Sequence, residues 1–68
     1  MADIFKVHEA ARVRLGKWAG SVGQVVDTRA DDTGKQTGVR LLIEGVRDGE
    51  PVRVERWFKR SELERNHG

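Results

Sequence analysis

The dipeptide Asp48-Gly49 stands between two runs in which apolar and polar residues alternate, and this arrangement constrains the fold more than any other feature. Alternation with a period of two is typical of a strand with one buried face. Asp-Gly between two such runs is a strong signal for a two-residue hairpin turn. The sequence therefore predicts antiparallel strands at residues 37–44 and 51–58, joined by this turn.

The predicted turn also determines which residues oppose one another. One face is apolar apart from Arg56, and its pairs are Ile43 with Val54 and Val39 with Phe58. The other face is polar, and its pairs are Glu44 with Arg53, Leu42 with Glu55 and Arg40 with Trp57. Opposite charges and a cation–π pair across two strands suit a solvated face. We therefore expect the first face to be buried and Arg40 to contact the ring of Trp57.

Other segments predict a small all-β domain. Alternating runs predict strands at residues 11–15 and at about 20–28, and a closing strand is expected at about 63–65 after one helical turn capped by Ser61. The segment 28–36 reads as a loop in which Gly34 takes a positive φ. Four to five short strands and no long helix predict a bent antiparallel sheet that closes into a partly open barrel.

The chain is expected to form one domain. Residues 1–10 are predicted to be an arm that packs Ile4 or Phe5 against the core, residues 11–65 the barrel, and residues 66–68 a flexible tail. A chain of 68 residues buries only about 60% of the surface that it exposes when unfolded. Burial against a partner or a second copy would therefore add to a marginal core.

Three glycines, Gly16, Gly20 and Gly23, separate the first two predicted strands. Glycine tolerates positive φ and allows another backbone to approach closely. We therefore predict a tight structural corner with little room for side chains.

Residues 11–26 resemble the KOW motif, which occurs in a ribosomal large-subunit protein family and in NusG-type transcription elongation factors. Gly16, Gly20, Gly23 and Val25 fall on the family pattern without a gap. The resemblance implies an SH3-like barrel that binds RNA or protein partners through the loops around this motif. Ribosomal members carry several basic residues in the loop, whereas only Lys17 is basic here and Trp18-Ala19 follows it.

Trp18 has three possible roles at the sequence level. It would stack on a base, fill a hydrophobic pocket of a protein partner, or fold back over the end of the barrel. The sequence leaves these alternatives open.

Basic residues beside an aromatic residue are an arrangement that binds single-stranded nucleic acid. The predicted binding residues are Lys17, Trp18, Arg40, Arg53, Trp57, Lys59 and Arg60. The competing interpretation is that Trp57 covers Leu42 while the arginines neutralise acidic neighbours, because the net charge is only +2. We therefore expect RNA or a nucleoprotein assembly as the partner, with a protein-interaction or homo-oligomerisation module as the alternative.

Catalysis has little support in the sequence. There is no cysteine, the two histidines lie near the ends of the chain, and no serine has the context of a catalytic nucleophile. We therefore predict no enzyme activity, no catalytic residue, no cofactor and no metal site. No apolar run approaches the ~20 residues that span a bilayer, and no secretion signal is recognisable, so we expect a cytoplasmic protein that does not act at membranes.

Overall fold

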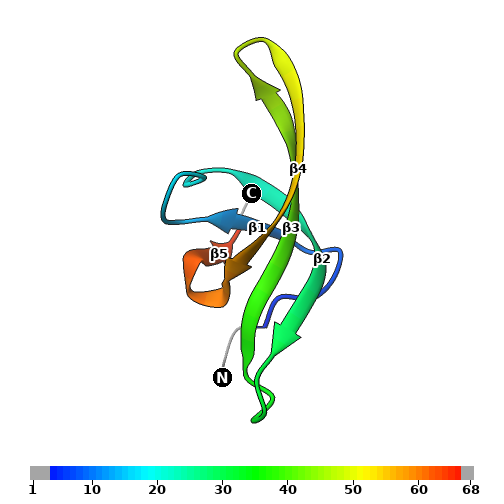
Figure 1. Ribbon diagram of the computed structural model, residues 1–68, viewed down its shortest axis with the longest axis vertical. Coiled ribbons are helices and arrows are strands. Elements are labelled where there is room, and N and C mark those ends of the chain that lie inside the picture. The colour runs from blue at the N-terminus through cyan, green and yellow to red at the C-terminus, as the bar shows by residue number, and fades with distance from the viewer. Residues whose placement is uncertain (1–3, 67–68) are drawn as a thin grey trace.

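A computed structural model describes residues 4–66 and shows one antiparallel sheet curled into a half-barrel (Figure 1). The elements are β1 (Ala10–Val13), β2 (Val22–Ala30), β3 (Gln36–Arg47), β4 (Glu50–Lys59), the 3₁₀ turn η1 (Arg60–Glu62) and β5 (Leu63–Arg65). Their order in the sheet is β4-β3-β2-β1-β5. The all-β prediction is confirmed, and the shape is compatible with a small SH3-like barrel. Residues 1–3 of the predicted N-terminal segment and residues 67–68 of the predicted tail lie outside the described residues.

The predicted pairing of β3 and β4 is confirmed in every pair, from Val39 opposite Phe58 to Glu44 opposite Arg53. Asp48 and Gly49 both have positive φ, 54° and 80°, as a tight two-residue turn that follows the twist of the strands requires. Both strands are longer than the alternating pattern indicated, because pairing continues to the turn itself.

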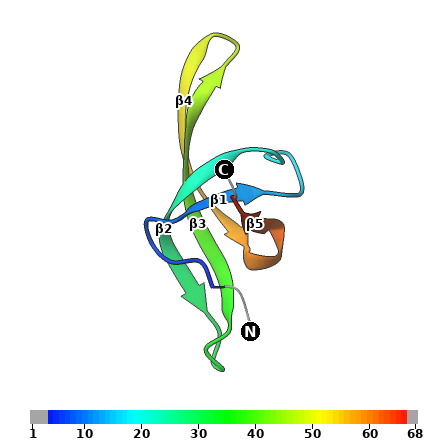
Figure 2. The ribbon, with the colours of Figure 1, turned by 180° about the vertical axis from the view of Figure 1, so that it is seen from behind.

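The hairpin of β3 and β4 projects beyond the rest of the sheet (Figures 1 and 2). The ladder between β2 and β3 ends at Gly23 opposite Ile43, so residues 44–53 form a ribbon of two strands, which we call the arm. The molecule is accordingly elongated, with extents of 43 × 21 × 20 Å. On the arm, Val46 exposes 76% of its surface.

Strand β2 lies two residues further along the chain than expected and is less regular. It runs to Ala30, and its register against β3 shifts between Val25 and Asp27 and again after Arg29. Val25 is buried, whereas Val26, at the first irregularity, is only half-buried. The loop that the sequence placed at residues 28–36 is therefore shorter, and its turn retains Gly34 at φ +85°.

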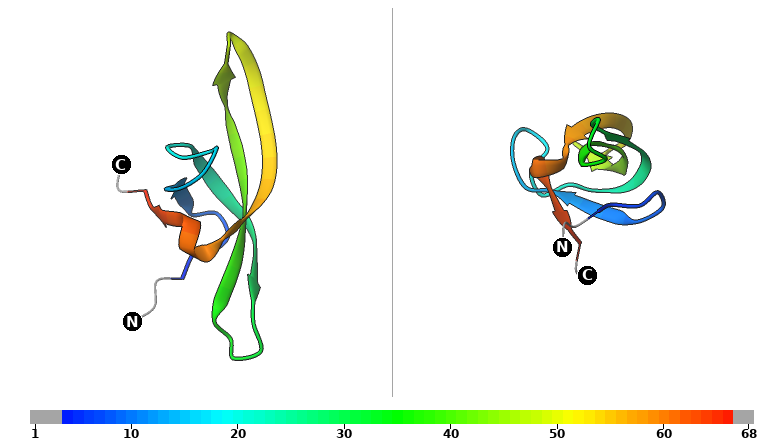
Figure 3. Two further views of the ribbon diagram at one scale, coloured as in Figure 1. Left: turned by 60° about the vertical axis from the view of Figure 1, so that its left-hand side comes forward. Right: turned by 90° about the horizontal axis from the view of Figure 1, so that it is seen from below.

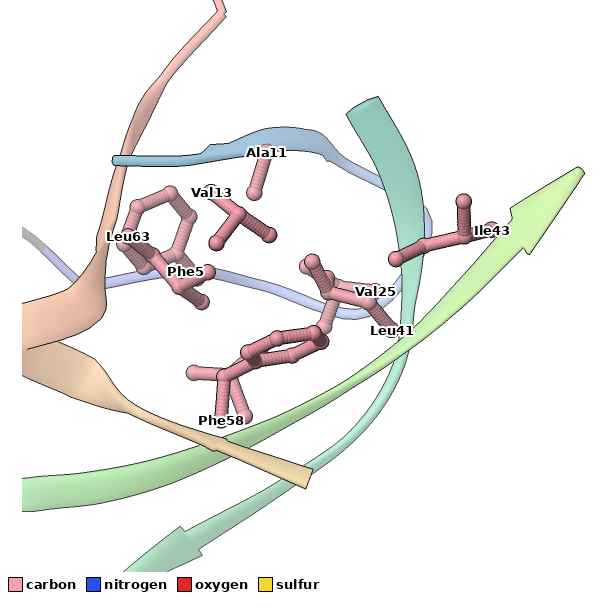
Figure 4. Close-up of a cluster of buried hydrophobic side chains, with 9 residues drawn as sticks. Phe5, Ala11, Val13, Val25, Leu41, Ile43, Phe58 and Leu63 are labelled. Carbon is pink, nitrogen blue, oxygen red and sulfur yellow. The ribbon is translucent and has the colours of Figure 1, made fainter. Parts of the chain in front are cut away.

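The core lies inside the curl of the sheet (Figure 4) and consists of Phe5, Ala11, Val13, Val25, Val39, Leu41, Ile43, Phe58 and Leu63. Of the two predicted anchors of the N-terminal arm, Phe5 is buried and Ile4 is 52% exposed. The backbone of Phe5 is held at both ends by one side chain, since Gln36 accepts from its N–H (3.0 Å) and donates to its C=O (2.9 Å).

Two local expectations are wrong. The first strand, predicted at residues 11–15, ends at Val13, and Leu15 beyond it is 54% exposed. Ser61 does not cap the helical turn, because it lies inside η1. The start of this turn is instead closed by Glu62, whose Oε1 accepts from the backbone N–H of Lys59 at 2.9 Å.

Candidate nucleic-acid interface

Trp57 lies on the face of the sheet opposite the core, which we call the outer face. Its neighbour Phe58 is buried, whereas Trp57 exposes 40% of its surface. The ring lies over Gly38 of β3, since a Cβ at Gly38 would be 3.6 Å from its Cε3 atom. The guanidinium carbon of Arg29 stands 4.5 Å from the ring centroid. Trp57 is thus an exposed aromatic surface held between backbone and a cation.

The prediction that Arg40 contacts the ring of Trp57 is wrong. The two residues are opposite each other in the ladder, but Nη2 of Arg40 donates to Oε2 of Glu55 at 2.9 Å. The cation at the ring is Arg29, because β2 continues as far as Ala30 and carries this residue opposite Gly38. Arg40 therefore neutralises the acidic neighbour Glu55, as the competing interpretation of the arginines predicted.

Arg53 and Lys59 share the outer face with Trp57, because the three residues occupy alternate positions of β4. Both cationic side chains are exposed. Lys59 lies opposite Gly38 and Arg53 lies opposite Glu44 in the ladder. The structure therefore places these two predicted binding residues in one row with Trp57.

Arg60 does not belong to this row. It begins η1, is half-buried, and its guanidinium carbon lies 4.5 Å from the ring centroid of Phe5. The turn that follows β4 directs this side chain to the N-terminal arm rather than to the outer face. The prediction of Arg60 as a binding residue beside Trp57 is thus not supported by its position.

The glycine loop between β1 and β2, residues 14–21, is a compact corner. Gly16 and Gly20 have φ of +86° and +90°, where side chains with a Cβ are strained. The N–H of Ala19 donates to the carbonyl of Gly16 at 3.1 Å, and that of Gly20 to the carbonyl of Val13 at 2.8 Å. The predicted corner is therefore closed by its own backbone.

Gly23 serves a different purpose from the other two glycines. A Cβ at this position would lie 2.8 Å from the carbonyl oxygen of Leu42 and 2.9 Å from Cγ1 of Ile43. Real Cβ atoms do not make contacts this short. Glycine at position 23 therefore allows the backbone of β2 to lie this close to Leu42 and Ile43 of β3. The close backbone approach expected for the glycine stretch thus occurs inside the sheet.

Trp18 folds back over the end of the barrel, which is one of its three predicted roles. It is half-buried and packs against the core cluster. The guanidinium carbon of Arg56 lies 5.7 Å from the Trp18 ring centroid. Its neighbour Lys17 is exposed. This packing fixes the position of the indole while part of its surface stays accessible.

A hollow of about 230 Å³ joins the glycine loop to β4, and both tryptophans line it. The lining residues are Leu15, Gly16, Lys17, Trp18, Arg56, Trp57, Phe58 and Glu62. The structure therefore brings together Lys17, Trp18 and Trp57, which the sequence placed in two separate segments. The glycine loop stands beside the base of the arm (Figure 3). A second hollow, of about 320 Å³, is lined by residues of both, and Trp18, Ile43 and Val52 are among them.

Sequence reasoning missed Arg29, which lies at the Trp57 ring, and Glu62, which lines the hollow. The segment around Arg29 contains Asp31-Asp32-Thr33-Gly34, which predicts a turn and conceals the end of β2. Arg56 carried a usable signal, because it is the one charged residue that interrupts the apolar face of its strand.

The described residues contain no group of three or more His, Cys, Asp or Glu side chains that could hold a metal ion. None of them belongs to a helix that is long and apolar enough to cross a membrane. Comparison with known proteins found no matching protein-family model and no significant match among curated proteins or solved structures.

Proposed function

We propose that this protein is a small, non-catalytic, KOW-type module that binds single-stranded RNA, alone or within a nucleoprotein assembly in the cytoplasm. The observation that carries the proposal is the hollow of about 230 Å³ lined by Trp18, Trp57, Lys17 and Arg56. Two tryptophans and two cationic residues that line one small space provide the two residue types that contact single-stranded nucleic acids.

The size of the hollow suits one nucleobase. It is smaller than the pockets of about 300–1,000 Å³ that hold drug-sized ligands. Trp18 is fixed by the core and Trp57 by Gly38 and Arg29, so a base would meet preorganised rings. Stacking on an aromatic side chain contributes about 1–3 kcal/mol per base.

A hydrogen-bond acceptor stands beside the two rings. Glu62 lines the same hollow, and its Oε1 already accepts from the N–H of Lys59. A carboxylate has about four acceptor sites, so Glu62 retains capacity for an amino or imino group of a base. Single-stranded RNA is read in this way, by stacking combined with hydrogen bonds to the base edge.

The phosphates would contact the exposed cations along β4. Lys59 and Arg53 flank Trp57 on the outer face, and Lys17 and Arg56 lie at the hollow. Acidic residues on the same face, including Glu44 and Glu55, weaken the positive field. We therefore expect modest affinity that falls as salt rises, with a slope of about −0.7 per neutralised phosphate.

Titration of the labelled chain with a mixed single-stranded RNA tests this proposal. At low salt, amide signals of Trp18, Trp57 and their neighbours should shift, and added salt should reverse the shifts. Trp57→Ala should weaken binding by about ten-fold, because it removes one stacking surface. The control is Lys35→Ala, which removes an exposed cation from the β2–β3 loop at the opposite end of the molecule from the arm (Figure 1).

Two outcomes would contradict the proposal. Spectra that do not change at low salt would exclude RNA binding at this face. Equal losses of affinity in Trp57→Ala and Lys35→Ala would show that binding depends on general charge rather than on the hollow.

One observation favours protein interaction as a second candidate function. The arm exposes Val46 and has backbone on both sides that no further strand of the described chain covers. Exposed strand edges of this kind are templates for pairing with another chain.

A further inference from the structure

Strand β4 forms one edge of the sheet. Within residues 4–66 it pairs with β3 alone, from Lys59 to Glu50. Because no strand of the described chain pairs with its other side, a row of backbone N–H and C=O groups faces outward along β4. Figure 2 shows this edge running along the projecting hairpin.

The residues that present these groups can be identified from Pro51. In an antiparallel ladder, every second residue directs its N–H and C=O away from the paired strand. Proline has no N–H, so it is tolerated in an edge strand at such an outward position. Arg53, Glu55 and Trp57 share the phase of Pro51 and therefore also turn their backbone groups to the open edge.

We propose that a second copy of this chain adds its own β4 to this edge, antiparallel, with Val54 opposite Val54 of the second copy. The two-fold axis would then pass between these two valines, perpendicular to the sheet. The dimer would share Arg53 and Trp57 with the proposed RNA site, but the argument for it rests on the backbone edge of β4 and not on the hollow between the tryptophans, so it is tested without RNA.

Charge complementarity selects this register. With Val54 opposite its counterpart, Arg53 lies opposite Glu55 of the second copy, and Glu55 lies opposite Arg53 of the second copy. Symmetry therefore produces two attractive cross-strand pairs on the outer face. Glu55 already accepts from Arg40, but a carboxylate can accept from a second guanidinium as well.

The neighbouring registers are unfavourable. A one-residue slip would set outer-face residues against inner-face residues and is excluded by the two-fold symmetry. A shift that centres the pair on Arg53 puts two arginines opposite each other, and one centred on Glu55 does the same with two glutamates. Like charges directly opposite destabilise a sheet, so the pattern of β4 favours the alignment centred on Val54 over these two neighbouring registers.

The apolar residues of the arm also gain partners in this arrangement. Pro51, which lies opposite the exposed Val46 in its own chain, comes opposite Trp57 of the second copy. Because proline has no N–H, one of the two backbone hydrogen bonds of this pair is not formed. On the inner face the two Val54 side chains meet as a β-branched pair. A two-stranded ribbon is at best marginally stable in water. Pairing would set residues 50–53 of each arm beside residues 55–58 of the second copy, so that β3 and β4 of the two copies form one sheet of four adjacent strands.

Two single charge reversals test the register. In a dimer of the Arg53→Glu variant, the new glutamate lies opposite Glu55 of the other copy. In a dimer of the Glu55→Arg variant, the new arginine lies opposite Arg53 of the other copy. Each variant alone should dimerise at least about ten-fold more weakly than the natural chain, because two attractive pairs become repulsive. An equimolar mixture should regain the dimer, since each Glu then meets an Arg in both pairs.

The measurement is sedimentation equilibrium of the full chain, without RNA, from micromolar to millimolar concentration. Circular dichroism checks that each variant is folded, and recovery of the dimer in the mixture is itself evidence that both variants fold. Arg12→Glu and Glu64→Arg, at exposed positions of β1 and β5, make the same charge changes away from β4 and should leave dimerisation unchanged.

Three results would overturn the proposal. The natural chain could remain a monomer at millimolar concentration. Each charge-reversed variant could dimerise as tightly as the natural chain. The mixture could stay as weak as its components although both are folded. The expected pattern, with loss in each variant and recovery on mixing, would support this edge and this register together.

Discussion

The guanidinium of Arg29 lies 4.5 Å from the ring centroid of Trp57, across the bare backbone of Gly38. The three residues come from three adjacent strands, β2, β4 and β3. Gly38 provides the space, because a side chain there would project between the other two. This contact holds the exposed indole over Gly38 on the outer face.

The Arg29–Trp57 contact leads to the first prediction. Arg29→Gln should lower the free energy of unfolding by about 0.5–1 kcal/mol, the usual contribution of an exposed cation–π pair. Urea denaturation measures this loss. The matched control is Arg14→Gln, at an exposed residue of the glycine loop that begins after β1. Equal effects of the two substitutions would contradict a specific contribution of the Trp57 contact.

Gly23 allows a sharper test of packing. Gly23→Ala would force a Cβ within 3 Å of both Leu42 and Ile43, so it should destabilise the fold by about 1–3 kcal/mol. Gly45→Ala is the control, because a Cβ at Gly45 meets nothing within 4 Å. Thermal unfolding of both variants gives the comparison. Similar melting temperatures would show that the sheet accommodates a Cβ at position 23 without loss of stability, contrary to the prediction.

Phe5 should be essential for stability although it precedes the first strand. It is 1% exposed, and its backbone is held by Gln36. Phe5→Ala should cost about 3–5 kcal/mol, which is most of the stability expected for a domain of this size. Ile4→Ala, at a residue that is 52% exposed, should change stability little. A folded Phe5→Ala variant of near-normal stability would be the contrary result.

The link between Glu9 and Arg65 predicts a loss of stability in acid. The hydrogen bond from Nη1 of Arg65 (2.6 Å) lowers the pKa of the Glu9 carboxyl, and the backbone N–H of Lys6 acts in the same direction. A carboxyl whose pKa is lower in the folded state stabilises the fold above its unfolded pKa, and this contribution is lost as pH falls through the folded pKa.

Glu9→Gln should therefore lower stability at neutral pH and reduce its dependence on pH below about 4.5. Urea unfolding at several pH values measures both effects. Asp31 contributes in the same direction, because hydrogen bonds from Thr33 lower its pKa, so some dependence on pH should persist in the variant. An unchanged pH profile would mean that the contact with Arg65 does not differ between the folded and unfolded chain.

The hairpin was predictable because its information is local. Asp48-Gly49 defines the turn, and period-two alternation on both sides leaves one register that buries Val39, Ile43 and Phe58. The corner at Gly16 and Gly20 was predictable for a similar reason, because glycine is the residue type that adopts positive φ without strain.

The candidate site was predictable only in part. Trp57, Arg53 and Lys59 share a face because of strand alternation, which the sequence displays. The pairing of Trp57 with Arg29 rather than Arg40, and the turn of Arg60 towards Phe5, depend on where β2 ends and where the chain bends after β4. These are long-range properties, set by the irregular register of β2 and by the closing turn η1.

The sequence by itself therefore determined the strands, the hairpin register and the positions that require glycine, since each follows from the conformational preferences of neighbouring residues. Only the tertiary structure decided that Trp18 and Trp57 line one hollow and that Phe5, rather than Ile4, completes the core. The physical reason is that the curl of the sheet brings together residues distant in sequence. Local patterns state which face a side chain occupies, but they do not state which distant side chain it meets.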